Sequence, residues 1–559
     1  MSSATAKPWL ASYAPGTAET INPTEYQSIL EVMERAFDRF RHRPAFSNMG
    51  KVLSYGEIDR LSLQFACYLR NVLKLEKGDR VAIMLLNTLQ YPVALLGVLR
   101  AGCVVVNTNP LYTPRELKHQ LNDSGAKAIV VLDNYAATLQ EVIKETPVQH
   151  VVVTGLGDML GFPKSLIVNF VVKYRKKMVP PYSLPGAVSF NDALKRGAGQ
   201  NLPKVSIQPS DLAFLQYTGG TTGVSKGAML MHSNMVANML QVSAWFGDRI
   251  KQGEEIIITA LPLYHIFALT CNCLVFMNVG GLNVLITNPR DMPGFIAELG
   301  KFPFTIITGV NTLFNGLLNT PGFDKLDFSK LKLSMGGGMA VQRAVAEKWK
   351  AVTGVALFEG YGMTESSPVA TMNRPDLSDY TGSIGMPGPS TELSIQSDDG
   401  QLLPQGEIGE ICIRGPQVMK GYWQRPEETA KVLTDDGWLR TGDVGKMDEN
   451  GYFYIVDRKK DMILVSGFNV YPNEIEDVIA QHPGVLEVAA VGVPDEKSGE
   501  AVKVVIVKKD PNLTAEDIKA HCRANMTGYK QPKLVEFRTE LPKTNVGKIL
   551  RRELRDAPK

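Results

Sequence analysis

Cysteine is scarce in this sequence, and the spacings that would give it a chemical role are missing. The 559 residues include six cysteines and no Cys-x-x-Cys pair. Cys271 and Cys273 have no histidine and no second cysteine pair at the spacing that zinc requires. These absences argue against a disulfide scaffold and a structural zinc site, and they predict buried free thiols in a reducing compartment.

A surplus of positive charge is also missing. The 60 Lys and Arg residues nearly balance the 57 Asp and Glu residues, which leaves a net charge of +3. Nucleic-acid binding usually requires a strongly basic face, so we expect no nucleic-acid partner. The apolar fraction of 44% and the charged fraction of 21% are typical of a soluble globular protein. They exclude a disordered, collagen-like or long coiled-coil chain.

No segment has the pattern of a targeting signal or a membrane span. The N-terminus lacks the apolar core of a secretory signal, and the last four residues are neither an endoplasmic-reticulum nor a peroxisomal address. The uncharged stretch 256–289 is long enough to cross a bilayer, but Pro262, His265 and several Asn and Gly residues interrupt it. We interpret it as a buried strand, loop and helix, and we predict a cytoplasmic protein.

Short apolar segments alternate with helical patterns early in the chain. Strands are predicted at 80–86, 103–107 and 128–132. The helix after the first strand ends at Ala101-Gly102, and the next helix opens on Thr113 with a capping box. This alternation predicts a parallel sheet covered by helices.

The pattern changes twice further along, and the fold class that we predict is α/β. After residue 255 the alternation returns, with a strand at 256–259 and a helix at 267–279, and it predicts a second α/β layer. From about residue 385 the pattern predicts antiparallel β-structure. A charged run at 457–461 then precedes a small α+β unit. We therefore expect a large N-terminal domain (1–456) with parallel sheets and a β-rich subdomain, a linker (457–461) and a C-terminal domain (462–559).

A stretch rich in glycine and threonine, residues 218–227, follows a predicted strand at 212–217. Its glycines let backbone N–H groups approach an anion, its threonines add hydroxyl donors, and Lys226 adds a charge suited to phosphate oxygens. It matches neither the Walker A loop nor the dinucleotide fingerprint. From composition alone, a flexible surface loop remains the alternative.

Three further stretches carry residues that suit nucleotide chemistry. Tyr361 could stack on a planar base, and Glu365 could hold Mg²⁺. A buried Asp443 could accept both hydroxyl groups of a ribose, and Lys548 lies in a short motif near the C-terminus. Taken singly, a strand-edge tyrosine, a solvated glutamate and a solvated lysine would look the same.

Taken together and in this order, the four stretches resemble the motifs of the ANL superfamily of adenylate-forming enzymes. The resemblance covers residues 26–555, and residues 436–464 are similar to the signature of fatty-acyl-CoA synthetases. It implies that a long-chain fatty acid attacks the α-phosphate of ATP to give acyl-AMP and pyrophosphate. The thiol of coenzyme A then displaces AMP. ATP and coenzyme A would be co-substrates, and Mg²⁺ the cofactor.

The resemblance also implies roles for individual residues. Lys548 would bridge the carboxylate and the α-phosphate, Thr218 and Glu365 would face Mg²⁺, and His265 would act in the acyl pocket. A core histidine without a direct substrate role remains the alternative for His265. ATP and AMP would be bound by Thr218, Gly219, Gly220, Thr221, Thr222, Gly223, Lys226, Gly337, Gly338, Gly360, Tyr361, Gly362, Thr364, Asp443 and Arg458.

The same resemblance implies that the C-terminal domain is mobile. It would rotate about the linker between the two half-reactions, with Lys460 at the hinge, and Lys548 would leave the site after adenylation. Ser466 and Gly467 would then help to form the coenzyme A tunnel. The gating tryptophan of some fatty-acyl synthetases is missing, so Phe267 is only a candidate for that gate.

Other functions remain open. A medium-chain or aryl-acid CoA ligase would differ in the shape of its acyl pocket, which the sequence does not give. A fatty-acyl-AMP ligase is disfavoured because no inserted segment precedes the linker. A non-catalytic lipid-binding protein on this fold is disfavoured because Lys548, Glu365 and Asp443 are all present.

The segment 162–179 suggests a membrane contact. Its apolar first half is followed by Lys173, Arg175, Lys176 and Lys177. This composition suits a helix that lies on the anionic inner face of the cell membrane, where fatty acids partition. A core-packed segment with a solvated basic end remains the alternative, and a homodimer also remains open.

Overall fold

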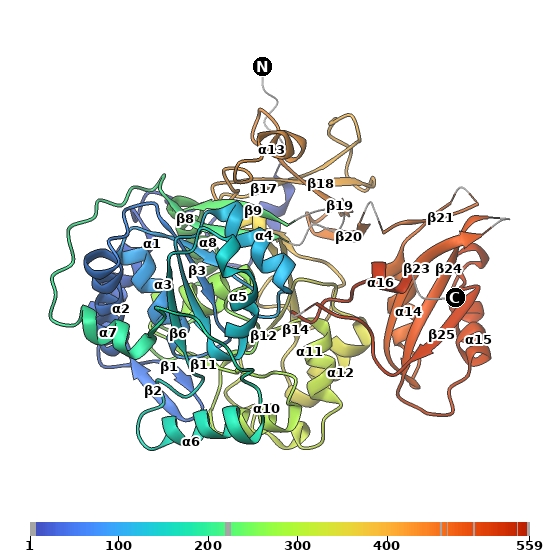
Figure 1. Cartoon of the computed structure of the whole chain (residues 1–559). Helices are drawn as coiled ribbons and strands as arrows, with labels where there is room; N and C mark the ends of the chain where they lie inside the picture. The colour runs from blue at the N-terminus through green and yellow to red at the C-terminus, as the bar shows by residue number, and fades with distance from the viewer. Residues whose placement is uncertain are drawn as a thin grey trace.

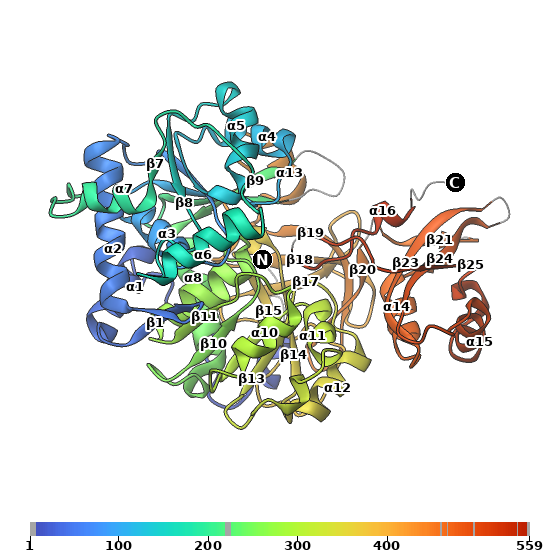
Figure 2. The same cartoon turned by 60° about the horizontal axis from the view of Figure 1, so that its bottom comes forward.

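The computed structural model describes residues 7–218, 225–458, 461–466, 468–495, 498–544 and 546–555. The predicted α/β fold class is confirmed: two sheets with parallel cores, a β-rich part and a smaller α+β unit are present (Figure 1). The smaller unit, built from residues after 460, lies to one side of the rest (Figures 1 and 2).

The first sheet contains the strands predicted from the early alternation. Neighbouring strands are parallel except for the last pair, in which β8 and β9 run antiparallel and carry the glycine-rich stretch between them. In the described residues its order is β7 (Val188–Ser189), β6 (His150–Thr154), β5 (Ala128–Leu132), β3 (Arg80–Met84), β4 (Val104–Asn107), β8 (Leu212–Thr218) and β9 (Lys226–Met231).

The second sheet carries the parallel strands expected after residue 255. The strands from β14 through β10 and β11 to β1 are parallel, and antiparallel strands close both edges. In the described residues its order is β16 (Met386–Pro387), β15 (Val369–Met372), β14 (Leu357–Gly362), β13 (Leu333–Gly336), β12 (Ile306–Gly309), β10 (Ile256–Thr259), β11 (Leu282–Leu285), β1 (Pro44–Asn48) and β2 (Lys51–Ser54).

Helices cover both sheets, and local sequence signals explain where several of them begin and end. The predicted capping box opens α4, and Gly125 ends it at a φ of 62°, where glycine avoids side-chain strain. The helices are α1 (Ile29–Phe40), α2 (Tyr55–Cys67), α3 (Gln90–Arg100), α4 (Pro114–Ser124), α5 (Ala136–Val142), α6 (Lys164–Phe170), α7 (Phe190–Gly197), α8 (His232–Phe246), α9 (Val275–Asn278), α10 (Met292–Leu299), α11 (Asn311–Leu318), α12 (Arg343–Thr353), α13 (Pro426–Val432), α14 (Pro472–Ala480), α15 (Ala515–Asn525) and α16 (Arg552–Arg555).

The helix predicted at 267–279 differs from its expected form. Its middle is a wide π-helical turn at Ala268–Leu274, and it continues as an α-helix at α9. Every residue of that turn is buried, and the Thr270 hydroxyl donates to the Ser367 carbonyl oxygen at 2.8 Å. Hydropathy spacing does not distinguish a π turn from an α turn, and π turns are frequent at functional sites.

The remaining strands form two antiparallel-rich sheets. The β-rich part predicted after residue 385 and the last, mixed sheet are both present, and the last sheet has an apolar cluster of its own. In the described residues the two sheets are β17 (Glu392–Gln396), β18 (Gly409–Arg414), β19 (Leu439–Met447) and β20 (Phe453–Arg458), and β22 (Phe468–Val470), β21 (Ile463–Val465), β24 (Gly499–Lys508) and β23 (Val485–Asp495) with β25 (Leu534–Arg538) beside β24.

Candidate active site

The glycine-rich stretch connects two strands of the first sheet. Thr218 ends β8 and is paired across the antiparallel ladder with Lys226, the first residue of β9. The two described ends of the predicted phosphate loop therefore lie side by side. The predicted ligands between them, Gly219, Gly220, Thr221, Thr222 and Gly223, lie outside the described residues, and their role stays a prediction.

Lys226 is held by residues that the motifs did not indicate. Its Nζ atom lies 2.6 Å from Glu428 Oε2 on α13 and 4.7 Å from the centroid of the Tyr422 ring. Lys226 and Lys431 together hold the pKa of the Glu428 carboxyl at about 2, through hydrogen bonds and charge. The cation proposed for phosphate therefore has a carboxylate as its partner in this structure.

Glu365 is buried and belongs to the same cluster. Its side chain accepts a 2.7 Å hydrogen bond from the Tyr422 hydroxyl, and it is only 6% exposed. Burial raises the pKa of Glu365, and the Tyr422 hydrogen bond and the Lys226 charge oppose that rise. A solvated surface glutamate, the alternative from sequence, is therefore wrong.

The donor set fits a magnesium ion that is shared with a phosphate. Among the described residues no three His, Cys, Asp or Glu side chains gather as a metal cluster. Mg²⁺ prefers one or two carboxylates completed by phosphate oxygens and waters. Glu365 and the Thr218 hydroxyl suit that mode, in which the ion would neutralise phosphate charge.

Tyr361 and Asp443 meet although 82 residues separate them. The Tyr361 hydroxyl, at the end of β14, donates to Asp443 Oδ2 at 2.7 Å. Asp443 is 7% exposed on β19 and is paired across the ladder with Arg458, the last residue of β20. The predicted adenine and ribose residues therefore lie together, while the orientation of the Arg458 side chain lies outside the description.

Close packing explains two of the predicted glycines. A Cβ atom on Gly337 would lie 3.0 Å from Cε1 of Phe267, and one on Gly362 would lie 1.9 Å from the Pro368 carbonyl oxygen. Gly338 has a φ of +77°, which favours glycine. Thr364 follows in a short 3-10 turn that also carries Glu365, and Gly360 has only ordinary contacts at its Cβ position.

His265 follows β10 in a loop that is held by two buried amides, Asn87 in the loop after β3 and Gln216 on β8. Asn87 donates to the carbonyl oxygens of Thr259 and Leu261, and Gln216 donates to that of Tyr264. His265 Nδ1 accepts from the Phe267 N–H at 3.3 Å. Burial and the nearby charge of Lys548 lower the pKa of His265 to about 4, so the imidazole is neutral at physiological pH.

Lys548 is brought to this site by a turn that contacts α11. The Thr312 hydroxyl donates to the Gly547 carbonyl oxygen at 3.0 Å. A Cβ atom on Gly547, whose φ is +81°, would lie 2.7 Å from that hydroxyl oxygen, so the close approach requires glycine. The structure thus places the Lys548 cation near His265, 283 residues earlier in the chain.

Arg551 forms a charged cluster that sequence reasoning missed. Its guanidinium binds Glu476 through two hydrogen bonds of 3.1 and 2.8 Å and donates to Asn473 Oδ1 at 2.6 Å. It also lies 3.9 Å from Asp457 and 3.7 Å from Asp461. Arg551 therefore contacts both ends of the predicted linker.

The remaining predicted residues belong to the linker and the coenzyme A region. Lys460 and Gly467 lie outside the described residues. Ser466 has a φ of 51°, and its N–H donates to the Ser498 carbonyl oxygen at 2.8 Å. Nothing in these contacts assigns a ligand to Ser466.

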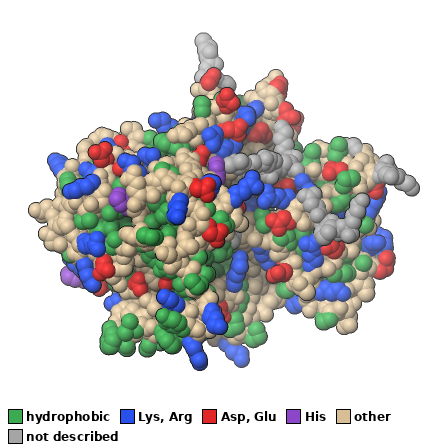
Figure 3. Space-filling view, in the orientation of Figure 1, with side chains coloured by type: hydrophobic (Ala, Val, Ile, Leu, Met, Phe, Trp, Pro, Cys, Tyr) green, Lys and Arg blue, Asp and Glu red, His purple; other side chains and the backbone are tan. Residues whose placement is uncertain are grey.

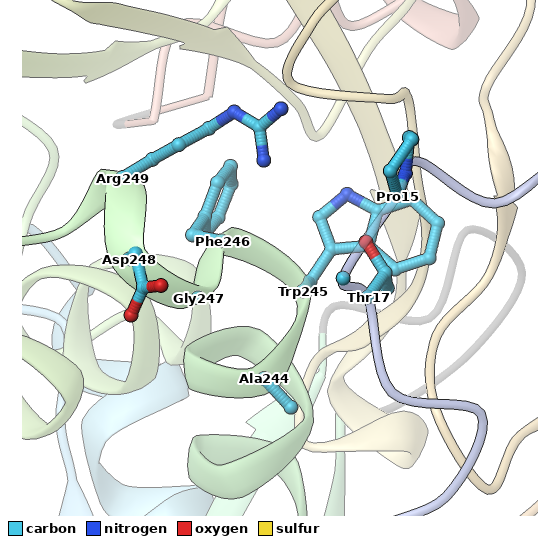
Figure 4. Close-up of a pocket in the computed structure, with 9 residues that line it drawn as sticks. Pro15, Thr17, Ala244, Trp245, Phe246, Gly247, Asp248 and Arg249 are labelled. Carbon is cyan, nitrogen blue, oxygen red and sulfur yellow. The ribbon is translucent and has the colours of Figure 1, made fainter.

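A hollow of about 410 Å³ lies elsewhere, between the N-terminal segment and the end of α8 (Figure 4). Pro15 and Thr17 lie beside the Trp245 ring there (Figure 4). The Tyr13 ring packs edge-on against the Trp245 ring, with the two centroids 5.0 Å apart, so the Trp245 ring anchors the segment. The hollow contains none of the predicted site residues.

Comparisons with known proteins agree with the geometry. Residues 33–423 match the AMP-binding enzyme family, and residues 474–548 match the AMP-binding enzyme C-terminal domain. A long-chain-fatty-acid–CoA ligase of Escherichia coli O6:H1 is 60% identical over 550 residues, 98% of each chain. The anthranilate CoA ligase AuaEII in complex with anthranoyl-AMP has a TM-score of 0.84 at 26% identity, over 96% of this chain and 99% of that one. ATP-bound MatB from Rhodopseudomonas palustris has a TM-score of 0.79 at 30% identity, over 94% and 98%.

Proposed function

The chain belongs to the AMP-binding enzyme family, and we propose that it is a long-chain-fatty-acid–CoA ligase. It activates the fatty acid through an acyl-adenylate, with ATP and coenzyme A as co-substrates. The observations that carry the proposal are the charge of Lys548 acting on the buried His265 and the hydrogen bond between Tyr361 and Asp443. The 60% identity to a long-chain-fatty-acid–CoA ligase over 98% of each chain supports the acyl class.

In the first half-reaction two anions must approach each other, the fatty carboxylate and the α-phosphate. A carboxylate is a poor electrophile at neutral pH, so AMP is installed as a leaving group. Lys548 neutralises the approaching charges, and the neutral His265 lines the acyl side without adding a competing cation. Tyr361 supports the base, Asp443 holds the ribose, and Mg²⁺ held by Thr218 and Glu365 would supply further charge neutralisation.

We also propose the division into domains 1–456 and 462–559 with a hinge at 457–461, Lys460 being the pivot. Arg551, three residues after Lys548, supports this proposal because it lies near both Asp457 and Asp461, at the two ends of the proposed hinge. In the second half-reaction Lys548 would leave, and Ser466 would turn toward coenzyme A.

The direct test separates the two half-reactions. Purified protein with Mg²⁺–ATP and palmitate should give palmitoyl-CoA only when coenzyme A is present. Lys548→Ala should suppress acyl-AMP formation and largely spare thioester formation from supplied acyl-AMP. Lys543→Ala is the matched control, because Lys543 lies on the same turn but pairs with Glu487 at 2.6 Å. Equal loss of both half-reactions in Lys548→Ala would contradict its role.

For the cellular location, none of the helices in the described part of the chain combines the length and hydropathy needed to cross a bilayer. We propose a cytoplasmic enzyme with a peripheral contact to the inner face of the cell membrane through residues 162–179. The exposure of that segment supports the contact and disagrees with the core-packed alternative.

A further inference from the structure

The helical segment 164–175, α6 and the π turn that continues it, presents an apolar face to solvent. Six of the 15 exposed large hydrophobic side chains in the described residues fall within 17 consecutive positions. Leu166, Phe170 and Tyr174 recur every four residues, so they share one side of the helix. They and their neighbours are 53–85% exposed: Phe162, Leu166, Ile167, Phe170, Tyr174 and Met178.

The opposite side of this segment is anchored to the protein. Asn169 Oδ1 accepts from the Gly157 N–H at 2.7 Å, and its amide donates to Asp158 at 2.8 Å. Val172 is buried, and Lys164 donates to the Met49 carbonyl oxygen. The exposed face is therefore held outward by fixed contacts.

Charge of one sign surrounds the apolar face. The chain carries five cations, Lys164, Lys173, Arg175, Lys176 and Lys177, and no acidic residue between Asp158 and Asp192. Four of the cations follow within five positions at the end of the helix. Figure 3 shows hydrophobic, Lys and Arg side chains together at the lower edge of the molecule, where α6 lies in Figure 1.

We propose that this surface, the α6 face, inserts into the interfacial region of a bilayer that contains anionic phospholipid. The proposal deepens the membrane contact proposed above by naming the inserting side chains and the lipid charge. Leu166, Ile167 and Phe170 enter the acyl boundary to a depth of about 5–10 Å, and Arg175 and Lys176 lie against phosphate groups. A protein partner would need an acidic surface beside an apolar groove, whereas the inner face of the membrane has acyl chains and negatively charged headgroups together.

Flotation with vesicles tests the α6 face in the full-length protein. Wild type should float with phosphatidylcholine vesicles containing one quarter phosphatidylglycerol and remain unbound with phosphatidylcholine alone. Arg175→Gln/Lys176→Gln should weaken partitioning by about 30-fold, since each cation near an anionic surface contributes about fivefold. Leu166→Ser/Phe170→Ser should weaken it by a factor on the order of 30 or more, because both side chains leave the acyl boundary.

Control variants and a soluble substrate separate this inference from the ligase function. Leu402→Ser/Ile408→Ser removes two side chains that are 52% and 49% exposed elsewhere, and it should float like wild type. All variants should convert albumin-bound palmitate at the wild-type rate in vesicle-free buffer, and the α6 variants should lose rate only with vesicle-dissolved oleate. Inactivity of every protein in buffer would contradict the ligase function and leave the flotation result standing.

Three outcomes would overturn the inference. Flotation of the α6 variants at the wild-type level would exclude the α6 face. Equal wild-type binding to uncharged vesicles would exclude the proposed lipid charge. The third outcome is that wild type does not bind vesicles but forms a concentration-dependent dimer. If Leu166→Ser/Phe170→Ser abolishes that dimer, the α6 face binds a second copy of the chain.

Discussion

Arg551 joins the turn that carries Lys548 to both ends of the 457–461 linker, and we predict that Arg551→Met weakens this arrangement. The guanidinium has three carboxylate neighbours, Glu476, Asp457 and Asp461, whose side chains are 11%, 0% and 17% exposed. Methionine keeps much of the apolar stem and removes the cation. Glu476, Asp457 and Asp461 then lose the counter-charge of Arg551, although Arg555 still lies 3.3 Å from Asp461.

The magnitude follows from the burial of the pairs. Removing one partner of a buried ion pair costs about 3–5 kcal/mol, and the 17% exposure of Arg551 and Asp461 places this case at about 3 kcal/mol. The Glu476 contact lies within the C-terminal unit, so its loss lowers the stability of that unit. The contact with Asp457 spans the linker. A loss of about 1.4 kcal/mol there shifts the equilibrium from the present arrangement toward the one in which Lys548 has left the site by about tenfold.

Denaturant unfolding and separate half-reaction assays measure these two effects. Arg551→Met should lower the free energy of unfolding and slow acyl-AMP formation more than thioester formation from supplied acyl-AMP. Arg551→Lys should recover part of both losses, and Arg552→Met, at an exposed neighbour, is the matched control. A fall of equal size in both half-reactions, or unchanged stability, would refute the reasoning.

Three further predictions concern buried or paired groups. Glu428→Gln should lower the KM for ATP, because the Glu428 carboxylate pairs with Lys226 and so competes with phosphate for that cation. An unchanged KM would contradict this competition. Tyr422→Phe should raise the pKa of Glu365 further and move the acid limb of the adenylation pH–rate profile to higher pH, since it removes a hydrogen bond that lowers that pKa. Burial lowers the pKa of His232 to about 4, so the unfolded chain binds this proton first and stability falls as pH drops from about 6.5 toward 4. The loss at pH 5 is about 2 kcal/mol, and denaturant titrations of wild type and His232→Gln should show a weaker pH dependence in the variant.

Local signals predicted much of the fold because they act over short stretches of chain. The strand at 128–132 and the strand at 256–259 have the predicted bounds, and Thr113 caps its helix as expected. The π turn at 268–274 was not predictable, because its geometry depends on packing around Thr270 and Ser367 rather than on hydropathy spacing.

The candidate site was predictable where a motif carries it and was missed where a contact spans the chain. Tyr361 and Asp443 were both predicted, and the structure adds the hydrogen bond between them. Tyr422 and Glu428 had no sequence signal, since their positions depend on how the segment after β18 lies over β9. Arg551 lies only three residues after Lys548, but its three acidic partners come from other segments.

The contacts that hold the C-terminal unit against the larger part suit a reversible arrangement. Thr312 donates to Gly547, Asn315 donates to the Leu486 carbonyl oxygen at 2.7 Å, and the Arg343 N–H donates to Asp477 at 3.1 Å. Each neutral hydrogen bond contributes about 1 kcal/mol net, because water replaces the partner when the contact opens. The apolar side chains of the unit meanwhile form their own buried cluster rather than joining the main core. Rotation would therefore expose little apolar surface, and the cost of moving Lys548 out of the site would be set by a few polar contacts and by Arg551.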